Sequence, residues 1–253
     1  MKSTSTEWVY GYHAVRTLLS AAPERIKTLF LQPDHVRNAE LRTLAHSMGV
    51  SVQPILNATL VKALGAEANH QGVACQCQSL APSESDLKNL LSIAESSKVS
   101  PLVLVLDGIE DPHNLGACLR SANVFGATCV IMPKDRAAPL SAVASKVASG
   151  AAALTPVIRV TNLARTLREL KEQGFWIIGL AGETDHALST IDCKGSMVLV
   201  LGREGEGLRE ITRKQCDFLA HIPMYGAIES LNVSAAAAIA LYEVRRQQAG
   251  RVG

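Results

Sequence analysis

The sequence is poor in aromatic residues and contains no long apolar stretch. Phe, Trp and Tyr together make up 4% of its 253 residues. No apolar run approaches the roughly 20 residues that a membrane-spanning helix needs. The first residues, MKSTSTEWVY, are polar and lack the apolar stretch of a secretory signal. We therefore expect a cytoplasmic protein without a membrane partner.

The cysteines lack the spacing of a metal site. There is no CxxC pair and no histidine spacing suited to zinc, so we expect no metal. Cys75 and Cys77 alternate with Gln76 and Gln78, which places both thiols on one face of a strand. We predict buried, reduced thiols for the whole set, which is Cys75, Cys77, Cys118, Cys129, Cys193 and Cys216.

A strong charge of either sign is also missing. The net charge is +2, which excludes a global basic field for nucleic acid. If the protein binds RNA, its positive surface must be local. Hydrophobic residues amount to 47%, enough for a substantial core.

Patterning divides the chain into three segments. Residues 1–82 alternate short helical and strand patterns, as in a small α/β unit, with strands at 26–32 and 72–78. Residues 83–100 are polar and Ser-rich between Pro82 and Pro101, which suits a linker carrying one helix.

Residues 101–253 have a regular α/β pattern. Apolar runs at 101–107, 128–133, 176–182 and 196–202 predict buried parallel strands. Helices are predicted around 115–125, after Asn162 as cap, near 208–215, and in the final Ala-rich stretch, with a short strand at 221–224. A mostly parallel sheet covered on both sides is the expected architecture.

The first of three notable clusters is D107-GIEDPHNLGACLR-120, which leads from a strand into a helix. Open α/β sheets bind ligands at such a place. Asn114 offers an amide that can orient a hydroxyl. Asn114 and Arg120 are six residues apart, so they share no tight helical face unless Asn114 stays in the loop. Gly116 allows close backbone approach, and Arg120 follows within the helix. A helix cap with a surface arginine is the alternative interpretation.

The second cluster is LVLGREGEGL, with glycines at Gly202, Gly205 and Gly207. Their order differs from the dinucleotide-binding pattern and from a phosphate loop. Glu204 and Glu206 would repel a polyphosphate but tolerate a cationic ligand such as a sulfonium. A flexible turn with solvated charges is the alternative.

The third cluster is I222-PMYGAIESLNVSAAAAIALYE-243. A short strand leads to Ser230, Leu231 and Asn232 and then into a helix, which Asn232 or Ser234 can cap. The alternative is a capped helix that only packs.

Taken together and in this order, the clusters resemble the three motifs of the SpoU (TrmH) branch of the SPOUT methyltransferases. WVYGYHAV, NHQGVACQC and IRVTNLARTL extend the resemblance over nearly the whole chain. The matching positions are Asn114, Gly116, Arg120, Gly202, Glu204, Gly205, Gly207, Pro223, Met224, Gly226, Ser230, Leu231, Asn232 and Ser234.

The resemblance implies a SPOUT domain with a deep trefoil knot, preceded by a small ribosomal-protein-like RNA-binding domain. It implies a homodimer that uses S-adenosylmethionine to 2′-O-methylate a guanosine in the peptidyl-transferase region of 23S ribosomal RNA. The cofactor would contact Gly202, Ile222, Met224 and Leu231.

The resemblance also assigns roles in the reaction. Asn114, Glu204, Ser230 and Asn232 would position the ribose and Arg120. In this family, the arginine that corresponds to Arg120 is given the role of removing the proton from the ribose hydroxyl. A guanidinium is a poor base, because it stays charged. Holding the adjacent phosphate and the developing alkoxide is the other role open to Arg120.

Several aromatic and histidine residues allow two interpretations. Trp8, Tyr10 and Tyr12 could stack on unpaired bases or simply pack. His13 and His70 suit ordinary structural roles, while His113 is a better candidate for a substrate contact.

Three other functions compete with this one. A tRNA ribose 2′-O-methyltransferase of the same fold is disfavoured by the compact N-terminal unit. A non-catalytic RNA-binding protein would not need Asn114, Arg120, Glu204 and Asn232. A nucleotide-dependent oxidoreductase does not fit the glycine order.

Overall fold

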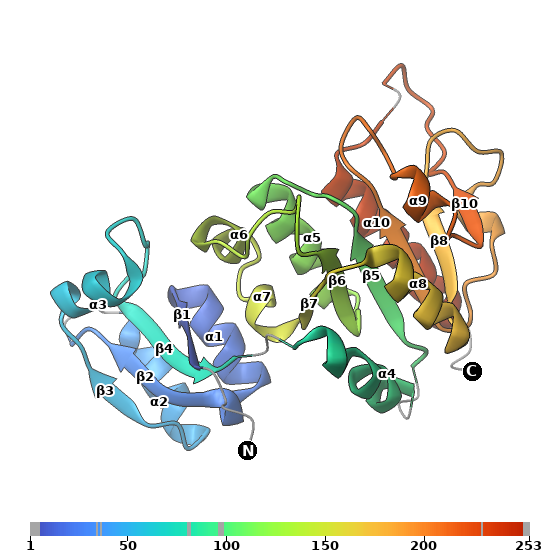
Figure 1. Ribbon diagram of the computed structural model, residues 1–253. Helices are drawn as coiled ribbons and strands as arrows, with labels where there is room; N and C mark the ends of the chain where they lie inside the picture. The colour runs from blue at the N-terminus through green and yellow to red at the C-terminus, as the bar shows by residue number, and fades with distance from the viewer. Residues whose placement is uncertain are drawn as a thin grey trace.

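The computed structural model describes residues 6–33, 35, 37–79, 82–95, 99–228 and 230–249, without the side chains of 95 and 142. They form two sheets, one in the first third of the chain and one in the rest. Figure 1 shows these two parts side by side, with the short helix α7 (Ala151–Leu154) between them.

The first sheet has the strand order β1-β4-β2-β3. The β1–β4 and β2–β4 pairs are antiparallel, and β2–β3 is parallel. Its elements are β1 (Thr6–Tyr10), α1 (Tyr12–Ala21), η1 (Pro23–Arg25), β2 (Ile26–Leu31), α2 (Asn38–Ser47), β3 (Val52–Pro54), α3 (Asn57–Leu64) and β4 (Val73–Gln78). The strands predicted at 26–32 and 72–78 are present as β2 and β4, but β1 was not predicted.

The aromatic residues of this part are partly buried. Trp8 packs against Phe30, with ring centroids 5.3 Å apart, and Tyr10 contributes to the same small core. The Tyr12 hydroxyl donates to Glu40. The Nδ1 atom of His70 accepts a hydrogen bond from the backbone N–H of Gly72 at 3.1 Å. Packing therefore accounts for Trp8 and Tyr10.

The Ser-rich segment carries η2 (Glu84–Asp86) and the helix α4 (Leu87–Glu95). Ser83 and Asp86 form a reciprocal capping box at the start of this turn. Leu87 and Leu91 are buried against the larger sheet. The predicted helix is thus present and is packed on the second part of the chain.

The second sheet is entirely parallel, as predicted, with the order β10-β8-β9-β5-β6-β7. Every residue of β5 is buried, as expected for a strand covered on both faces. The strands are β5 (Leu102–Leu106), β6 (Cys129–Pro133), β7 (Val157–Val160), β8 (Trp176–Leu180), β9 (Met197–Leu201) and β10 (Phe218–Ala220).

Helices cover the two faces of this sheet. On one face, α5 (Pro112–Val124) and α10 (Val233–Ala249) pack against each other and share a core with α6 and α7. On the other face lie α4 and α8 (Leu163–Glu172). As predicted, Asn162 caps α8 by accepting a hydrogen bond from the N–H of Arg165 at 3.0 Å.

The elements here that were not predicted include β7, α6 (Ala142–Val147) and α7 (Ala151–Leu154). Both helices are short and rich in alanine, so their sequence has little apolar periodicity. Their position comes from tertiary contacts: Gly150 packs against Ala14 and Thr17 of α1, and Arg25 donates a hydrogen bond to the carbonyl oxygen of Ala153. These contacts join the two parts of the chain.

The strand predicted at 221–224 was wrong. β10 ends at Ala220, and only His221 continues through an isolated bridge to Ala187. From Ile222 onward the chain has left the sheet. Two other short elements are η3 (Leu188–Thr190) and α9 (Glu210–Arg213), the latter inside the helix predicted at 208–215.

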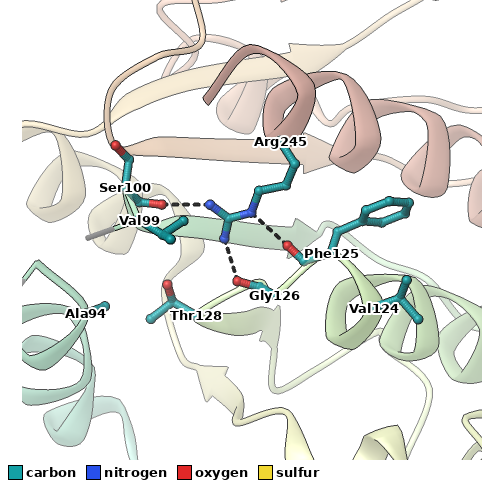
Figure 2. Close-up of a pocket in the computed structure, with 8 residues that line it drawn as sticks. All are labelled: Ala94, Val99, Ser100, Val124, Phe125, Gly126, Thr128 and Arg245. Atoms are coloured by element: carbon teal, nitrogen blue, oxygen red, sulfur yellow. Dashed lines mark hydrogen bonds between the residues drawn. The ribbon is translucent and has the colours of Figure 1, made fainter. Parts of the chain in front are cut away.

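Arg245 holds the end of α5 to the start of β5. Its guanidinium donates to the carbonyl oxygens of Phe125 at 2.7 Å, Ser100 at 2.8 Å and Gly126. Figure 2 shows the three bonds at the wall of a surface hollow. Burial lowers the pKa of Arg245, and the carbonyl groups satisfy its donors.

The six cysteines are free, as predicted, with five buried and Cys216 half-buried. Burial raises the pKa of Cys118 and of Cys129 to about 12. None of the helices among the described residues is both long enough and apolar enough for a membrane span.

Candidate active site

The site lies at the carboxyl ends of β5 and β9, which are neighbours in the sheet. The backbone N–H of Asp107, just after β5, donates to the carbonyl oxygen of Leu201 at the end of β9, at 2.8 Å. The loops that follow the two strands therefore start side by side, where parallel sheets commonly bind ligands.

The helix α5 begins at Pro112, two residues before Asn114. Asp111 is its N-cap and accepts a hydrogen bond from the N–H of His113 at 2.9 Å, with Pro112 in the first turn. Asn114 is therefore in the first turn of the helix, and it shares no helical face with Arg120, which follows six residues later. Proline with an aspartate cap starts a helix efficiently, which explains a start at this position.

A chain of hydrogen bonds joins the three clusters. The Asn114 Nδ2 donates to the Glu204 Oε2 at 3.1 Å, and the Asn232 Nδ2 donates to the Asn114 Oδ1 at 2.9 Å. A carboxylate only accepts, so the Asn114 amide nitrogen must face Glu204 and its oxygen must face Asn232. The chain of bonds therefore fixes the orientation of the Asn114 amide.

The last member of this chain is anchored to α10. The Asn232 Oδ1 accepts from the Ser234 N–H at 2.9 Å and from the Ser234 hydroxyl at 2.6 Å. Asn232 is thus the cap of α10, one of the two caps that the sequence allowed. The same side chain caps a helix and holds Asn114, so it lacks freedom to rotate.

The glycine-rich cluster is a tight turn. Arg203 and Gly207 exchange two backbone hydrogen bonds of 2.9 Å, and Gly205 and Gly207 have positive φ angles of 81° and 71°. A Cβ atom at Gly202 would lie 2.1 Å from the carbonyl carbon of Gly207. Only glycine fits position 202, because the turn folds directly over it.

Gly116 lies where two helices approach closely. A Cβ atom there would lie 2.5 Å from the carbonyl oxygen of Ala144 and 2.7 Å from the Cβ of Val147. Gly116 therefore permits the close packing of α5 on α6. The close backbone approach expected at Gly116 is therefore a contact between two helices.

Arg120 and Ser230 do not join the hydrogen-bonded chain. Arg120 is exposed on α5, about 9 Å further along the helix axis than Asn114. Within the described part of the chain, neither Arg120 nor Ser230 makes a side-chain hydrogen bond or an ion pair. The Arg120 guanidinium is therefore available to a ligand or to another chain.

The segment that was predicted to bind a cofactor exposes apolar side chains. Met224 is 41% exposed, Leu231 is 36% exposed, and Ile222 is half-buried. Tyr225 and Ile228 are more exposed, at 98% and 79%. Apolar groups concentrated in one exposed segment indicate a surface that a ligand or partner covers.

Sequence reasoning missed three ion pairs that brace the site. Arg203 contacts Glu110 at 2.7 Å and Glu206 at 3.1 Å. Arg209 pairs with the fully buried carboxylate of Asp107. Partners as distant in sequence as Glu110 and Arg203 leave no signal in a single sequence. Among the described residues, no group of three potential metal ligands is present.

This arrangement can perform a specific kind of chemistry. Two amides and a carboxylate of fixed orientation can hold a hydroxyl group, and Arg120 can hold an anion. The glycine turn and the exposed apolar segment can accept a flat, partly cationic ligand. These are the requirements for placing a hydroxyl group against an electrophile.

Family models match both parts of the chain. The model described as the SpoU rRNA Methylase family matches residues 101–242. The model described as RNA 2′-O ribose methyltransferase substrate binding matches residues 8–83.

Relatives of known function match over nearly the full length. A 23S rRNA (guanosine-2′-O-)-methyltransferase RlmB of Coxiella burnetii is 48% identical, covering 95% of this chain and 95% of its own. The Escherichia coli K12 protein of the same name is 46% identical, covering 96% and 99%. Among solved structures, the SpoU methyltransferase AviRb from Streptomyces viridochromogenes, in complex with AdoMet, has a TM-score of 0.75 at 22% identity, covering 97% of this chain and 91% of its own.

Proposed function

We propose, because this chain belongs to the SpoU rRNA methylase family, that it is an enzyme that 2′-O-methylates a guanosine ribose in 23S rRNA with S-adenosylmethionine as methyl donor. The observation that carries the proposal is the hydrogen-bonded chain Glu204–Asn114–Asn232. It brings one residue from each of the three motif-like clusters to a single point.

The residues present fit S-adenosylmethionine. This cofactor supplies a methyl group on a cationic sulfur. Gly202 has no side chain and the turn folds directly over it, so this part of the site offers backbone groups to a ligand. Ile222, Met224 and Leu231 offer partly exposed apolar surface for the flat base. We propose these four residues as its contacts.

The fixed amides act on the ribose. Asn114 and Asn232 hold each other, and Glu204 holds Asn114, so the substrate meets donors and acceptors that are already oriented. Ser230, two residues before Asn232 and free of hydrogen bonds within the described residues, supplies a further hydroxyl. The contribution of these residues is orientation, where displacements of about 1 Å can cost about 100-fold in rate.

Arg120 stabilises negative charge on the substrate. A neutral ribose hydroxyl is a poor nucleophile and must lose or share its proton. A guanidinium keeps its own proton at working pH, so Arg120 holds the neighbouring phosphate and stabilises the developing negative charge on the ribose oxygen. A phosphate oxygen or a water molecule then takes the proton.

The location of the substrate nucleotide and the assembly are part of the same proposal. We place the guanosine in the peptidyl-transferase region, and the protein in the cytoplasm as a homodimer. The exposed Arg120 and the exposed apolar segment support a second copy near the site. We also propose that residues 1–82 form a ribosomal-protein-like RNA-binding domain, 83–100 a linker and 101–253 the methyltransferase domain.

The trefoil knot belongs to the proposal as well. The chain leaves the edge strand β10, yet it returns so that Asn232 reaches Asn114 and α10 packs on α5. This return from the edge of the sheet to its middle supports a path that threads the loop between β9 and β10.

The test is methylation of large-subunit rRNA that lacks its native modifications, with labelled S-adenosylmethionine and nuclease mapping. A single 2′-O-methylguanosine in the peptidyl-transferase region is the expected product. The Arg120→Ala variant should bind the cofactor with unchanged affinity by calorimetry but should lose turnover.

Other outcomes would redirect the assignment. Label in transfer RNA alone would keep the reaction and change the substrate. Label in neither RNA, together with tight RNA binding, would favour a non-catalytic binding protein. Loss of both cofactor binding and turnover in Arg120→Ala would contradict the role given to Arg120.

A further inference from the structure

Arg203 connects the two loops that form the site. Its Nη2 lies 2.7 Å from the Glu110 Oε1, in the loop after β5, and its Nη1 lies 3.1 Å from the Glu206 Oε2, within its own turn. One side chain thus ties the glycine turn to the entry of α5.

This tie is more buried than a usual surface ion pair. The Arg203 side chain is 25% exposed, whereas Glu110 and Glu206 are 62% and 73% exposed. The arginine crosses the backbone of Gly108, where a Cβ atom would lie 2.8 Å from the Arg203 Nε. Packing on the loop backbone restricts the guanidinium, so it contributes more than an exposed, freely moving pair.

The backbone of Arg203 also closes the turn, through its two hydrogen bonds with Gly207. The next residue, Glu204, is exposed, and within the described residues its side chain bonds only to Asn114. Two consecutive side chains therefore hold the turn against α5, Arg203 through Glu110 and Glu204 through Asn114.

We infer that Arg203 is a positioning residue, which acts through Glu204 to hold the Asn114 amide in its working orientation. Arg203 does not itself contact the ribose or the methyl donor. This inference rests on the proposed function, because it assigns the working orientation to the methyl-transfer reaction.

The experiment compares four full-length variants. Three are the single variants Arg203→Met, Arg203→Lys and Glu110→Ala, and the fourth is a double variant that carries both Arg203→Met and Glu110→Ala. Arg165→Met is the matched control, because Arg165 also bridges two glutamates, Glu84 at 2.5 Å and Glu169 at 3.5 Å. The readouts are kcat and KM on unmodified 23S rRNA, the melting temperature, and hydrogen exchange of the 203–208 backbone without RNA or cofactor.

In Arg203→Met we expect kcat to fall about ten-fold, while KM for RNA changes less than two-fold. Arg203→Lys should recover part of kcat, because an ammonium can reach one glutamate but not both. The double variant should be no slower than Arg203→Met, as expected for residues that act as one unit. Exchange of the 203–208 amides should be several-fold faster in Arg203→Met and unchanged in Arg165→Met.

Three results would overturn the inference. They are a kcat within two-fold of wild type in Arg203→Met, an equal fall in Arg165→Met, and unchanged exchange at 203–208. If the wild-type protein transferred no methyl group, the proposed function would fail. The exchange result would still show separately whether Arg203 holds the turn.

Discussion

Asn114 donates a hydrogen bond to Glu204 across 90 positions of sequence, with 3.1 Å between the Asn114 Nδ2 and the Glu204 Oε2. The direction of this bond is set by chemistry, since the carboxylate has no proton to give. The rest of the site depends on it, because the same Asn114 side chain accepts from Asn232.

Asn114→Asp should remove this bond and set two carboxylates against each other. Like charges at hydrogen-bond distance repel, so the Glu204 side chain will turn away. We expect kcat to fall about 100-fold, with cofactor affinity and melting temperature little changed. Steady-state methylation measures kcat, and calorimetry measures the cofactor affinity and the melting temperature. Asn89→Asp, at an exposed position of α4, is the control, and equal activity of the two variants would contradict the role of Asn114.

Gly202→Ala should displace the glycine turn. The new methyl group would lie 2.1 Å from the Gly207 carbonyl carbon, so residues 203–207 must move. We expect a destabilisation of about 1–3 kcal/mol in urea unfolding and a cofactor affinity at least ten-fold weaker. Gly182→Ala provides the comparison, since its Cβ would meet nothing within 4 Å. Normal cofactor binding by Gly202→Ala would place the cofactor elsewhere.

Leu231→Arg should block the proposed cofactor surface without unfolding the protein. Leu231 is 36% exposed, so a longer side chain can be accommodated by the fold but projects over the apolar segment. We expect S-adenosylmethionine affinity to fall at least ten-fold, measured by calorimetry. Leu56→Arg, at a 72% exposed position in the first part of the chain, should bind normally. Unchanged affinity in Leu231→Arg would rule out this placement.

Glu84 should make the stability of the protein sensitive to acid. Burial raises the pKa of this carboxyl, but hydrogen bonds from the Thr161 backbone N–H and from Arg165 outweigh burial and hold the pKa below its ordinary value of 4.5. A depressed folded-state pKa stabilises the fold above the unfolded-state pKa, and this contribution is lost as pH falls through the folded-state pKa.

The melting temperatures of wild type and Glu84→Gln test this. Wild type should be more stable at pH 6, and the difference should close as pH falls below about 4.5. Glu172→Gln changes an exposed glutamate of α8 and serves as control. A difference that is constant from pH 6 to pH 3 would show that the charge of Glu84 does not matter.

Local patterns predicted much of the fold. The strands β5, β6, β8 and β9 are continuous apolar runs, because both faces of a parallel sheet are buried. Asn162 and Asn232 were recognised as helix caps, because capping needs only an amide oxygen just before a helix.

Elements without a strong periodicity of apolar residues were missed or misplaced. The alanine-rich helices α6 and α7 carry little apolar periodicity, and contacts with α5 and α1 place them. The apolar residues at 221–224 predicted a strand, but they lie beyond the end of β10, which ends at Ala220. Close backbone approach was expected at Gly116, but its partner could not be named because α6 was itself not predicted.

The sequence by itself determined which residues stand at the ends of the buried strands and which side chains can cap, donate or accept there. Only the tertiary structure decided which of them meet. Asn114 contacts Glu204 and Asn232 because β5 lies beside β9 and α10 returns onto α5. Arg120 is on the same helix as Asn114 but takes no part in these hydrogen bonds. The pairing of Arg203 with Glu110 has the same origin. Hydrogen bonds between such distant residues depend on strand order, and no local pattern carries strand order.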